Sequence, residues 1–156
     1  MSVQSEIRDA LVTLVESVSN VGAVHNRARF TADWSNFNTL FKATIGGVEQ
    51  IRGWWVQWSG ITATNVPGTG FGDDADIWRF TIRGVLALKD AGDTETTFND
   101  LMLAIVNAIR ASSHLGEAEV MRYSHRVTTS EPDIRQFGSV VCNYGEIYVD
   151  VTVITG

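Results

Sequence analysis

The chain has 156 residues, 44% of them hydrophobic and 19% charged, which predicts a single globular domain over residues 1–156. Its net charge of −6 disfavours a basic nucleic-acid-binding surface, and its single cysteine, Cys142, excludes an internal disulfide framework and a multi-cysteine zinc site. No apolar run approaches the roughly eighteen residues of a transmembrane helix, and Glu6, Asp9 and Glu16 make the N-terminus unlike a signal peptide.

The first predicted element is an amphipathic helix over residues 3–19. Polar residues fill one side of it, and the other side carries apolar residues at helical spacing, namely Ile7, Leu11, Leu14, Val15 and Val18. Ser2 or Ser5 can cap the start of this helix. Asn20 and Gly22 are typical of a helix end.

The next stretch carries weaker signals. Residues 23–29 predict a short extended segment. Residues 33–43 are compatible with a short helix that Asp33 caps and that carries Trp34, Phe37, Leu40 and Phe41. The Gly46–Gly47 pair is then expected to end that helix.

Two alternating stretches predict a long antiparallel hairpin in the centre of the chain. In residues 51–61 (IRGWWVQWSGI), one face carries Trp54, Val56 and Trp58, and the other carries Trp55, Gln57 and Ser59. In residues 76–90 (DIWRFTIRGVLALKD), the apolar face carries Trp78, Phe80, Ile82, Leu86 and Leu88. Most of the opposite face of that second strand is polar, with Arg79, Thr81, Arg83 and Lys89.

Residues 65–76 (NVPGTGFGDDAD) predict a flexible loop that joins the two strands, because they hold one proline, three glycines and three aspartates. The glycines do not form a phosphate-binding loop, since Asp73 and Asp74 follow where that loop needs a lysine and a hydroxyl residue. Asp73, Asp74 and Asp76 are compatible with a calcium ion, but the glycine and bidentate glutamate of a calcium loop are missing. We therefore favour an acidic, solvated loop without a metal.

A second helix follows, and the chain then returns to strand patterns. Asp93, Thr94 or Thr96 can cap the helix, whose apolar stripe consists of Phe98, Leu101, Met102, Ile105 and Ile109. Alternation returns near residues 121–127, and Glu131-Pro132-Asp133 reads as a turn. In the last strand, Ile147, Val149, Val151 and Val153 form one face, and Glu146, Tyr148, Asp150 and Thr152 form the other. This order predicts an α+β fold: a mostly antiparallel sheet with a long central hairpin and two main helices packed on one face.

Residue patterns for catalysis or metal binding are scarce. His25, His114 and His125 show no metal-ligand spacing, and for His125 we favour a half-buried structural role. Cys142 lies in a strand-like stretch, which favours a buried, inert thiol. We therefore expect no catalytic residue, no cofactor and no metal site.

One polar and aromatic face stands out as a candidate interface. Trp55 points away from Trp54, and Arg79 and Arg83 of the paired strand are expected on the same side. Tyr148 of the last strand adds a second aromatic residue to such a face. This composition fits either plain solvent surface or a docking surface for a second copy of the chain, and the sequence leaves both open.

The order of elements resembles the tail terminator, or tail completion, proteins of long-tailed bacteriophages. The resemblance lies in an N-terminal helix (IRDALVTLVESV), a long hairpin (WWVQWSGI to DIWRFTIRGVLAL), a helix (TTFNDLMLAIVNAIRA) and a closing strand (CNYGEIYVDVTVITG). It covers most of the chain as an arrangement of elements and includes no diagnostic motif.

The resemblance implies a structural virion protein without enzymatic activity. Such a subunit forms a ring, a hexamer in that family, which caps the tail tube and joins it to the head connector. The implied partners are other copies of the chain, the tube protein and the connector protein, with DNA passing through without specific binding and no membrane involved. The implied location is the tail or neck of the virion, with assembly in the host cytoplasm. Within the loop, Phe71, Asp73, Asp74 and Asp76 are the candidate contacts to the tube or connector.

Two other readings remain open. The chain could be a different neck or tail-tube structural protein, which would polymerise into long tubes instead of closing into a ring. It could also be a small α+β ligand-binding or enzymatic domain, or more remotely a regulatory binding module. The enzymatic reading requires a histidine to converge with an acidic residue.

Overall fold

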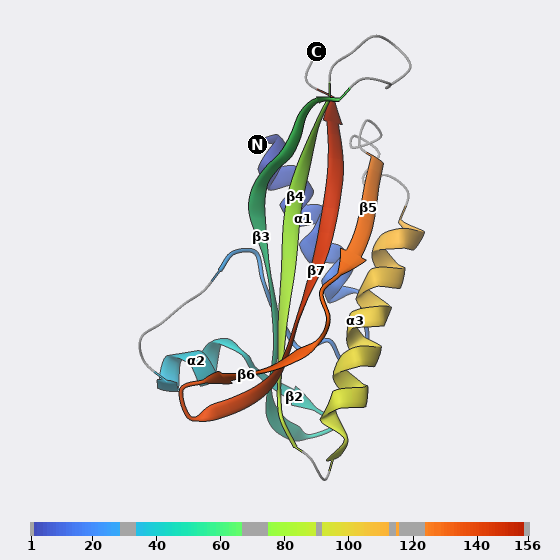
Figure 1. The fold of residues 1–156 in the computed structure, drawn as a ribbon. Helices are drawn as coiled ribbons and strands as arrows, with labels where there is room; N and C mark the ends of the chain where they lie inside the picture. Colours follow the sequence, from blue (N-terminus) through green and yellow to red (C-terminus); the bar gives the residue numbers. More distant parts are fainter. Residues whose placement is uncertain are drawn as a thin grey trace.

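The computed structural model describes residues 2–28, 34–66, 75–89, 92–112, 115 and 124–154. Within them it has a mixed α and β fold with a seven-stranded sheet and three helices (Figure 1). The elements in chain order are α1 (Val3–Glu16), β1 (Ala23–His25), α2 (Trp34–Leu40), β2 (Lys42–Ile45), β3 (Val48–Val66), β4 (Ala75–Ala87), α3 (Thr94–Ala111), β5 (Ser124–Thr129), β6 (Asp133–Phe137) and β7 (Val140–Ile154).

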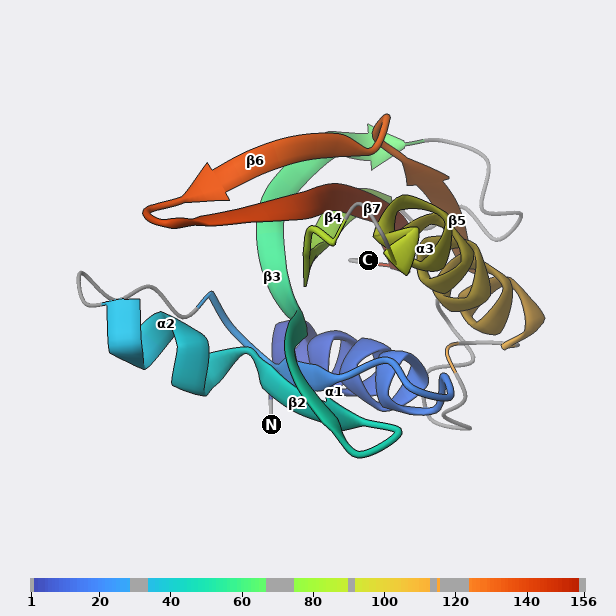
Figure 2. The ribbon, with the colours of Figure 1, turned by 90° about the horizontal axis from the view of Figure 1, so that it is seen from below.

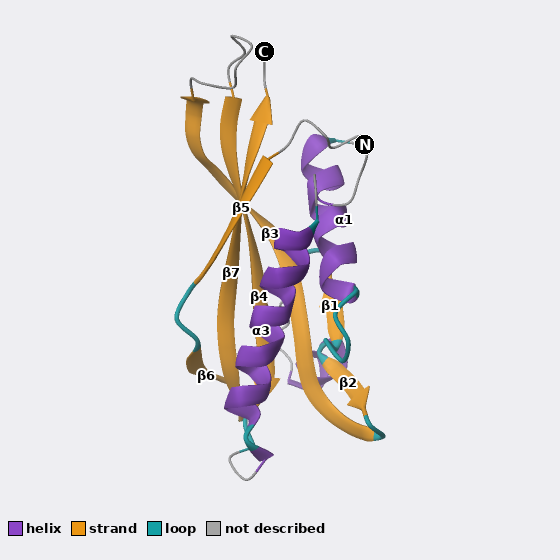
Figure 3. Ribbon diagram, turned by 90° about the vertical axis from the view of Figure 1, so that its right-hand side faces the viewer, coloured by secondary structure: helices purple, strands orange, loops and turns teal. Residues whose placement is uncertain are grey.

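Three long strands, β3, β4 and β7, form the centre of the sheet. The strand order is β1-β3-β4-β7-β5, with β2 added to β3 and β6 added to β7. β4 pairs antiparallel with both long neighbours, and β1 pairs parallel with β3. Figure 3 shows α1 and α3 on the same side of this sheet, which we call the helix side.

The helix side holds the larger hydrophobic core. The apolar stripes of α1 and α3 are buried there, which confirms the periodicity of both helices. The alternating residues Ile147, Val149, Val151 and Val153 of β7 are buried against them, also as predicted. Both predicted helix caps are present: the Ser2 hydroxyl accepts a hydrogen bond from the backbone N–H of Ser5, and the Asp93 carboxylate accepts one from Thr96. α1 is shorter than expected and ends at Glu16.

A row of two glycines lets a large aromatic residue and α3 pack closely on the sheet. Trp54, Gly84 and Gly145 lie side by side on β3, β4 and β7. The indole of Trp54 covers Gly84 and stacks on Phe98 of α3, with ring centroids 5.5 Å apart and an interplanar angle of 3°. Met102 of α3 occupies the space above Gly145. Any side chain at Gly84 would overlap the Trp54 ring, so this row fixes the distance between helix and sheet.

A second, smaller core lies on the opposite side of the sheet. Its buried members are Phe41, Trp55, Val85, Cys142 and Tyr144. α2 and the β6–β7 hairpin project on the same side of the molecule and enclose this core (Figure 2). The rings of Phe37 and Phe137 stack there, with centroids 5.4 Å apart.

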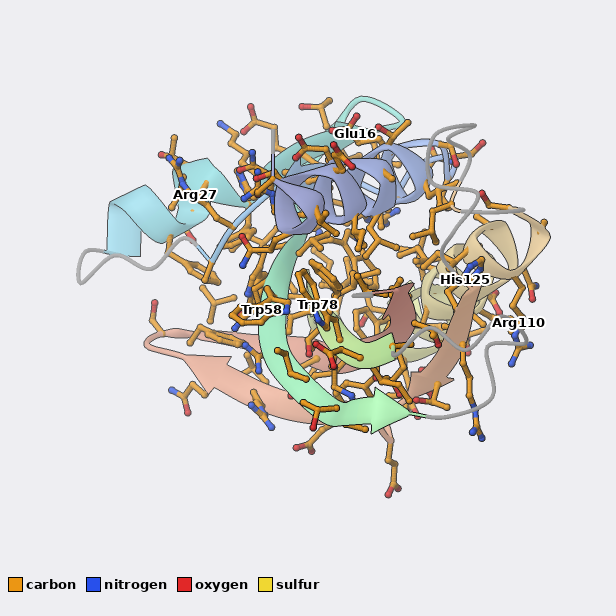
Figure 4. The ribbon with its side chains drawn as sticks, turned by 90° about the horizontal axis from the view of Figure 1, so that it is seen from above. Glu16, Arg27, Trp58, Trp78, Arg110 and His125 are labelled. Atoms are coloured by element: carbon orange, nitrogen blue, oxygen red, sulfur yellow. The ribbon has the colours of Figure 1, made fainter. Side chains whose placement is uncertain are left out.

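Two sequence predictions about the central hairpin are wrong. The loop predicted over 65–76 is shorter, because β3 continues to Val66 and β4 begins at Ala75. β7 is long enough to pair with this end of β4, so Asp76 lies in the ladder opposite Val153. The alternation placed Trp58 on the same face as Trp54 and Val56, which predicts a core position, but 40% of its surface is exposed. β1 pairs only with residues 53–55, so β3 is an edge strand at Trp58, and the indole contacts Trp78 from one side (Figure 4).

Candidate functional site

The sheet side opposite α1 and α3 carries a connected polar surface in its upper part, as Figure 1 is drawn. We call it the polar face, and it consists of Gln57, Arg79, Arg83, Glu146, Tyr148 and Asp150. The strand register brings these residues together, because Arg79 pairs with Asp150 and Arg83 with Glu146 across β4 and β7. Directly opposed residues on neighbouring strands project on the same side of a sheet.

At one end of the polar face, Arg79 is held by two partners. Its Nε and a terminal nitrogen donate to the two carboxylate oxygens of Asp150, at 2.9 and 3.1 Å. The guanidinium also lies 4.8 Å from the ring centroid of Tyr148, a cation–π distance. The hydrogen bond to Asp150 raises the pKa of Arg79, so the guanidinium keeps its charge at this end of the face.

At the other end, Glu146 is the centre of a second network. Its carboxylate accepts hydrogen bonds from the hydroxyls of Tyr144 and Tyr148, both at 3.0 Å. Arg83 lies 3.9 Å from the same carboxylate and donates to the side-chain oxygen of Gln57 at 2.6 Å. The charges of the polar face are therefore largely neutralised within one chain, and its geometry is set before any partner binds.

Trp55, a sequence-predicted interface residue, is buried within the single chain. Its alternation with Trp54 is as expected, since it lies on the side of the polar face, but only 3% of its surface is exposed. The chain segment that follows α2 folds over it, with the Phe41 ring centroid 5.4 Å away. Its indole N–H donates to the side-chain oxygen of Gln57, a member of the polar face, at 3.3 Å. Trp55 thus contacts the polar face from the buried core beneath it.

The other sequence-predicted residues divide between this face and the rest of the chain. Arg79, Arg83 and Tyr148 come together on the polar face, each partly exposed. Asp76 lies in β4 and is partly buried. Phe71, Asp73 and Asp74 lie outside the described residues. Sequence reasoning missed Gln57, Glu146 and Asp150 as site residues, although the alternation had placed all three on the correct face.

Two of the three histidines considered for other chemistry have structural partners, and His114 lies outside the described residues. His25 and His125 each place Nε2 against a backbone carbonyl oxygen, of Leu40 at 2.6 Å and of Ile109 at 2.8 Å. Figure 4 shows His125 beside α3, and its side chain is half-buried, as predicted. Cys142 is buried, and burial raises its pKa to about 11, as expected of an inert thiol. Over the described ranges, no three His, Cys, Asp or Glu side chains are grouped to hold a metal ion. No helix in that part of the chain has the length and apolar character to span a membrane.

The phenol of Tyr144 is expected to make the stability of the fold decrease at high pH. Burial raises its pKa to about 12, and the hydrogen bond to Glu146 acts in the same direction. The folded chain holds the Tyr144 proton to higher pH than the unfolded chain does. The free energy of unfolding that this group contributes below pH 10 is therefore lost between pH 10 and 12, and the loss is about 2 kcal/mol. Urea unfolding of wild type and Tyr144→Phe at several pH values tests this. Above pH 10, the unfolding free energy of the variant should fall less steeply with pH than that of wild type. Equal slopes in both proteins would contradict a raised pKa for Tyr144.

Comparisons with known proteins give no relative. The sequence matches no protein-family model, and it matches no curated protein sequence.

Proposed function

We propose that the chain is a structural subunit that closes into a ring, caps the end of a phage tail tube and joins the tail to the head connector. The observation that carries the proposal is the polar face. Both long helices lie on the other side of the sheet (Figure 3), and α2 lies near the lower end of the molecule (Figure 1). Arginine and tyrosine are enriched at protein–protein interfaces, and Arg79, Arg83 and Tyr148 of this half-buried face support an interface role.

The subunit frame in this proposal is the long β3–β4 hairpin with α1 and α3 packed on one face. A closed ring needs two different surfaces that complement each other around a rotation axis. The polar face supplies one of them. The free edge of β5, which pairs only with β7 among the described strands, supplies a candidate for the other.

The remaining partners in the proposal come from the resemblance of the sequence to tail terminator proteins. In the proposal, six copies form the ring, the tube protein and the connector protein bind its two ends, and DNA passes through without specific contacts. Phe71, Asp73 and Asp74 are the proposed contacts to the tube or connector, and Asp76 anchors the base of that segment. The proposed location is the tail or neck of the virion, after assembly in the host cytoplasm, and no catalytic step is involved.

The proposal is tested by measuring the mass of the purified chain in solution over a concentration series, with negative-stain images of the same samples. We expect closed rings, or a monomer that converts into rings as concentration rises. Long open tubes would favour a tube subunit instead. A monomer or dimer at every concentration would contradict self-assembly. In that case a melting shift produced by a metal or small ligand would favour a binding domain.

A further inference from the structure

Arg52 of β3 is a buried cation on the helix side of the sheet. It lies two residues before Trp54 on the same face, and only 8% of its surface is exposed. Its two terminal nitrogens donate to the backbone oxygen of Asn20 at 2.8 Å and to the side-chain oxygen of Gln50 at 2.9 Å. Its Nε is buried and has no hydrogen-bond partner. The guanidinium is therefore fixed in place, and its Nε–H donor is unused.

No carboxylate of a described residue lies within ion-pair distance of this charge. Among the described residues, Arg52 forms no ion pair, and both of its acceptors are uncharged. Burial lowers the pKa of Arg52, and no nearby acidic group offsets that effect. A buried charge without a counter-charge is unfavourable, which makes this arginine a candidate for a binding site.

A shallow cavity of about 510 Å³, widely open to the surface, lies beside Arg52, between the turn after α1 and the first half of α3. Ser19, Asn20 and Thr97 contribute polar groups to its lining, and its apolar lining is Val18, Leu101 and Ala104. The exposed Asp100 also lines it. The cavity thus combines one buried cation, several uncharged polar groups and an apolar wall.

The chain turn after α1 is built to hold Arg52 in this position. Asn20 adopts a left-handed conformation, φ 60°, and its backbone oxygen accepts from the guanidinium. Gly22 has φ 99°, and a side chain there would collide with the backbone oxygen of Arg52. The turn therefore packs directly on β3 at this residue.

We propose that this cavity binds a carboxylate group that pairs with Arg52. A single cation with Asp100 nearby favours a monoanion over a phosphate dianion, and the apolar wall fits a short aliphatic tail. The group comes either from a small free carboxylate or from an acidic side chain of a second copy, since the chain has a net charge of −6. The site lies on the opposite side of the sheet from the polar face, so it does not depend on the proposed ring.

Sodium propionate is the probe for the free carboxylate, with propionamide and sodium chloride at equal ionic strength as controls. The readout is the NMR signal of the Arg52 Nε–H group in the full chain. We expect a saturable shift with propionate only, with a Kd on the order of 10 mM. Asp100→Asn should bind roughly fivefold tighter, because it removes a nearby negative charge. An equal response to chloride or to propionamide would overturn the proposal.

Matched variants distinguish the two sources of the carboxylate. Arg52→Gln should abolish the melting shift caused by propionate, whereas Arg110→Gln, an exposed arginine on α3, should keep it. If propionate has no effect but Arg52→Gln alone weakens self-association in sedimentation, a second copy supplies the carboxylate. If propionate has no effect and both variants self-associate like wild type, the proposal is wrong. The NMR titration uses the wild-type chain, so it tests the binding of free propionate even if Arg52→Gln does not fold.

Discussion

Replacing Gly84 by alanine is expected to destabilise the fold by about 3 kcal/mol, at the upper end of the usual cost of overpacking a core. The new methyl group would overlap the six-membered ring of Trp54. That ring cannot move aside, because it is fully buried and stacked on Phe98 of α3. Its indole N–H also donates to the backbone oxygen of Val21 at 2.9 Å, which ties the indole to the segment after α1. Relief therefore requires a shift of helix and sheet together.

Two further glycine substitutions serve as controls for the Gly84 prediction. Gly145→Ala faces mainly the thioether of Met102, a flexible side chain that can adopt another rotamer, so we expect a smaller loss. Gly92→Ala would place its methyl group 3.6 Å from Lys89 Cβ, an ordinary contact, and should change stability by less than about 0.5 kcal/mol. Urea unfolding of the three variants gives the comparison. A loss at Gly84 no larger than that at Gly92 would show that the Trp54 ring is not rigidly held.

The elements with strong periodicity could be predicted because their burial follows from local pattern alone. The stripe of α3 from Phe98 to Ile109 and the alternation of β7 from Ile147 to Val153 both face one continuous core. The turn at Gly46 and Gly47 was misread as a helix end. Both glycines have positive φ, 58° and 80°, and they join β2 to β3 as a tight hairpin. A Gly-Gly pair between two alternating strands is a hairpin signal, and it was present in the sequence.

The candidate site was only partly predictable, because it depends on contacts between distant segments. Alternation assigned Arg83 and Glu146 to polar faces, but their pairing depends on the register of β4 against β7. Trp55 has the same local pattern as an exposed interface residue. Its burial results from Phe41, which lies in a segment with an ambiguous pattern. The buried Arg52 was missed because charged residues are ordinarily exposed, and nothing in its neighbouring residues signals the turn at Asn20.

Removing the Arg79–Asp150 pair is expected to impair ring assembly while leaving the subunit folded. In the double variant Arg79→Ala/Asp150→Ala, both charges are removed together, so no unpaired charge is left on the sheet. Both side chains reach solvent, and such pairs contribute only about 0–1 kcal/mol to folding. At a subunit interface the same groups would lie in a contact repeated at every junction of the ring. We expect the concentration needed for assembly to rise at least about tenfold, the equivalent of 1.4 kcal/mol per contact.

The matched control is Arg8→Ala/Asp9→Ala, which removes an ion pair of similar exposure from α1, on the helix side of the sheet. Sedimentation over the same concentration range should show ring formation for this control and for wild type at similar concentrations. If all three proteins assemble at the same concentration, the polar face is not part of the ring interface. A loss of more than about 2 kcal/mol in the unfolding free energy of the Arg79/Asp150 variant would instead make the pair a structural element of the sheet. The two measurements together separate assembly from stability, because the Arg79–Asp150 pair can affect either one without the other.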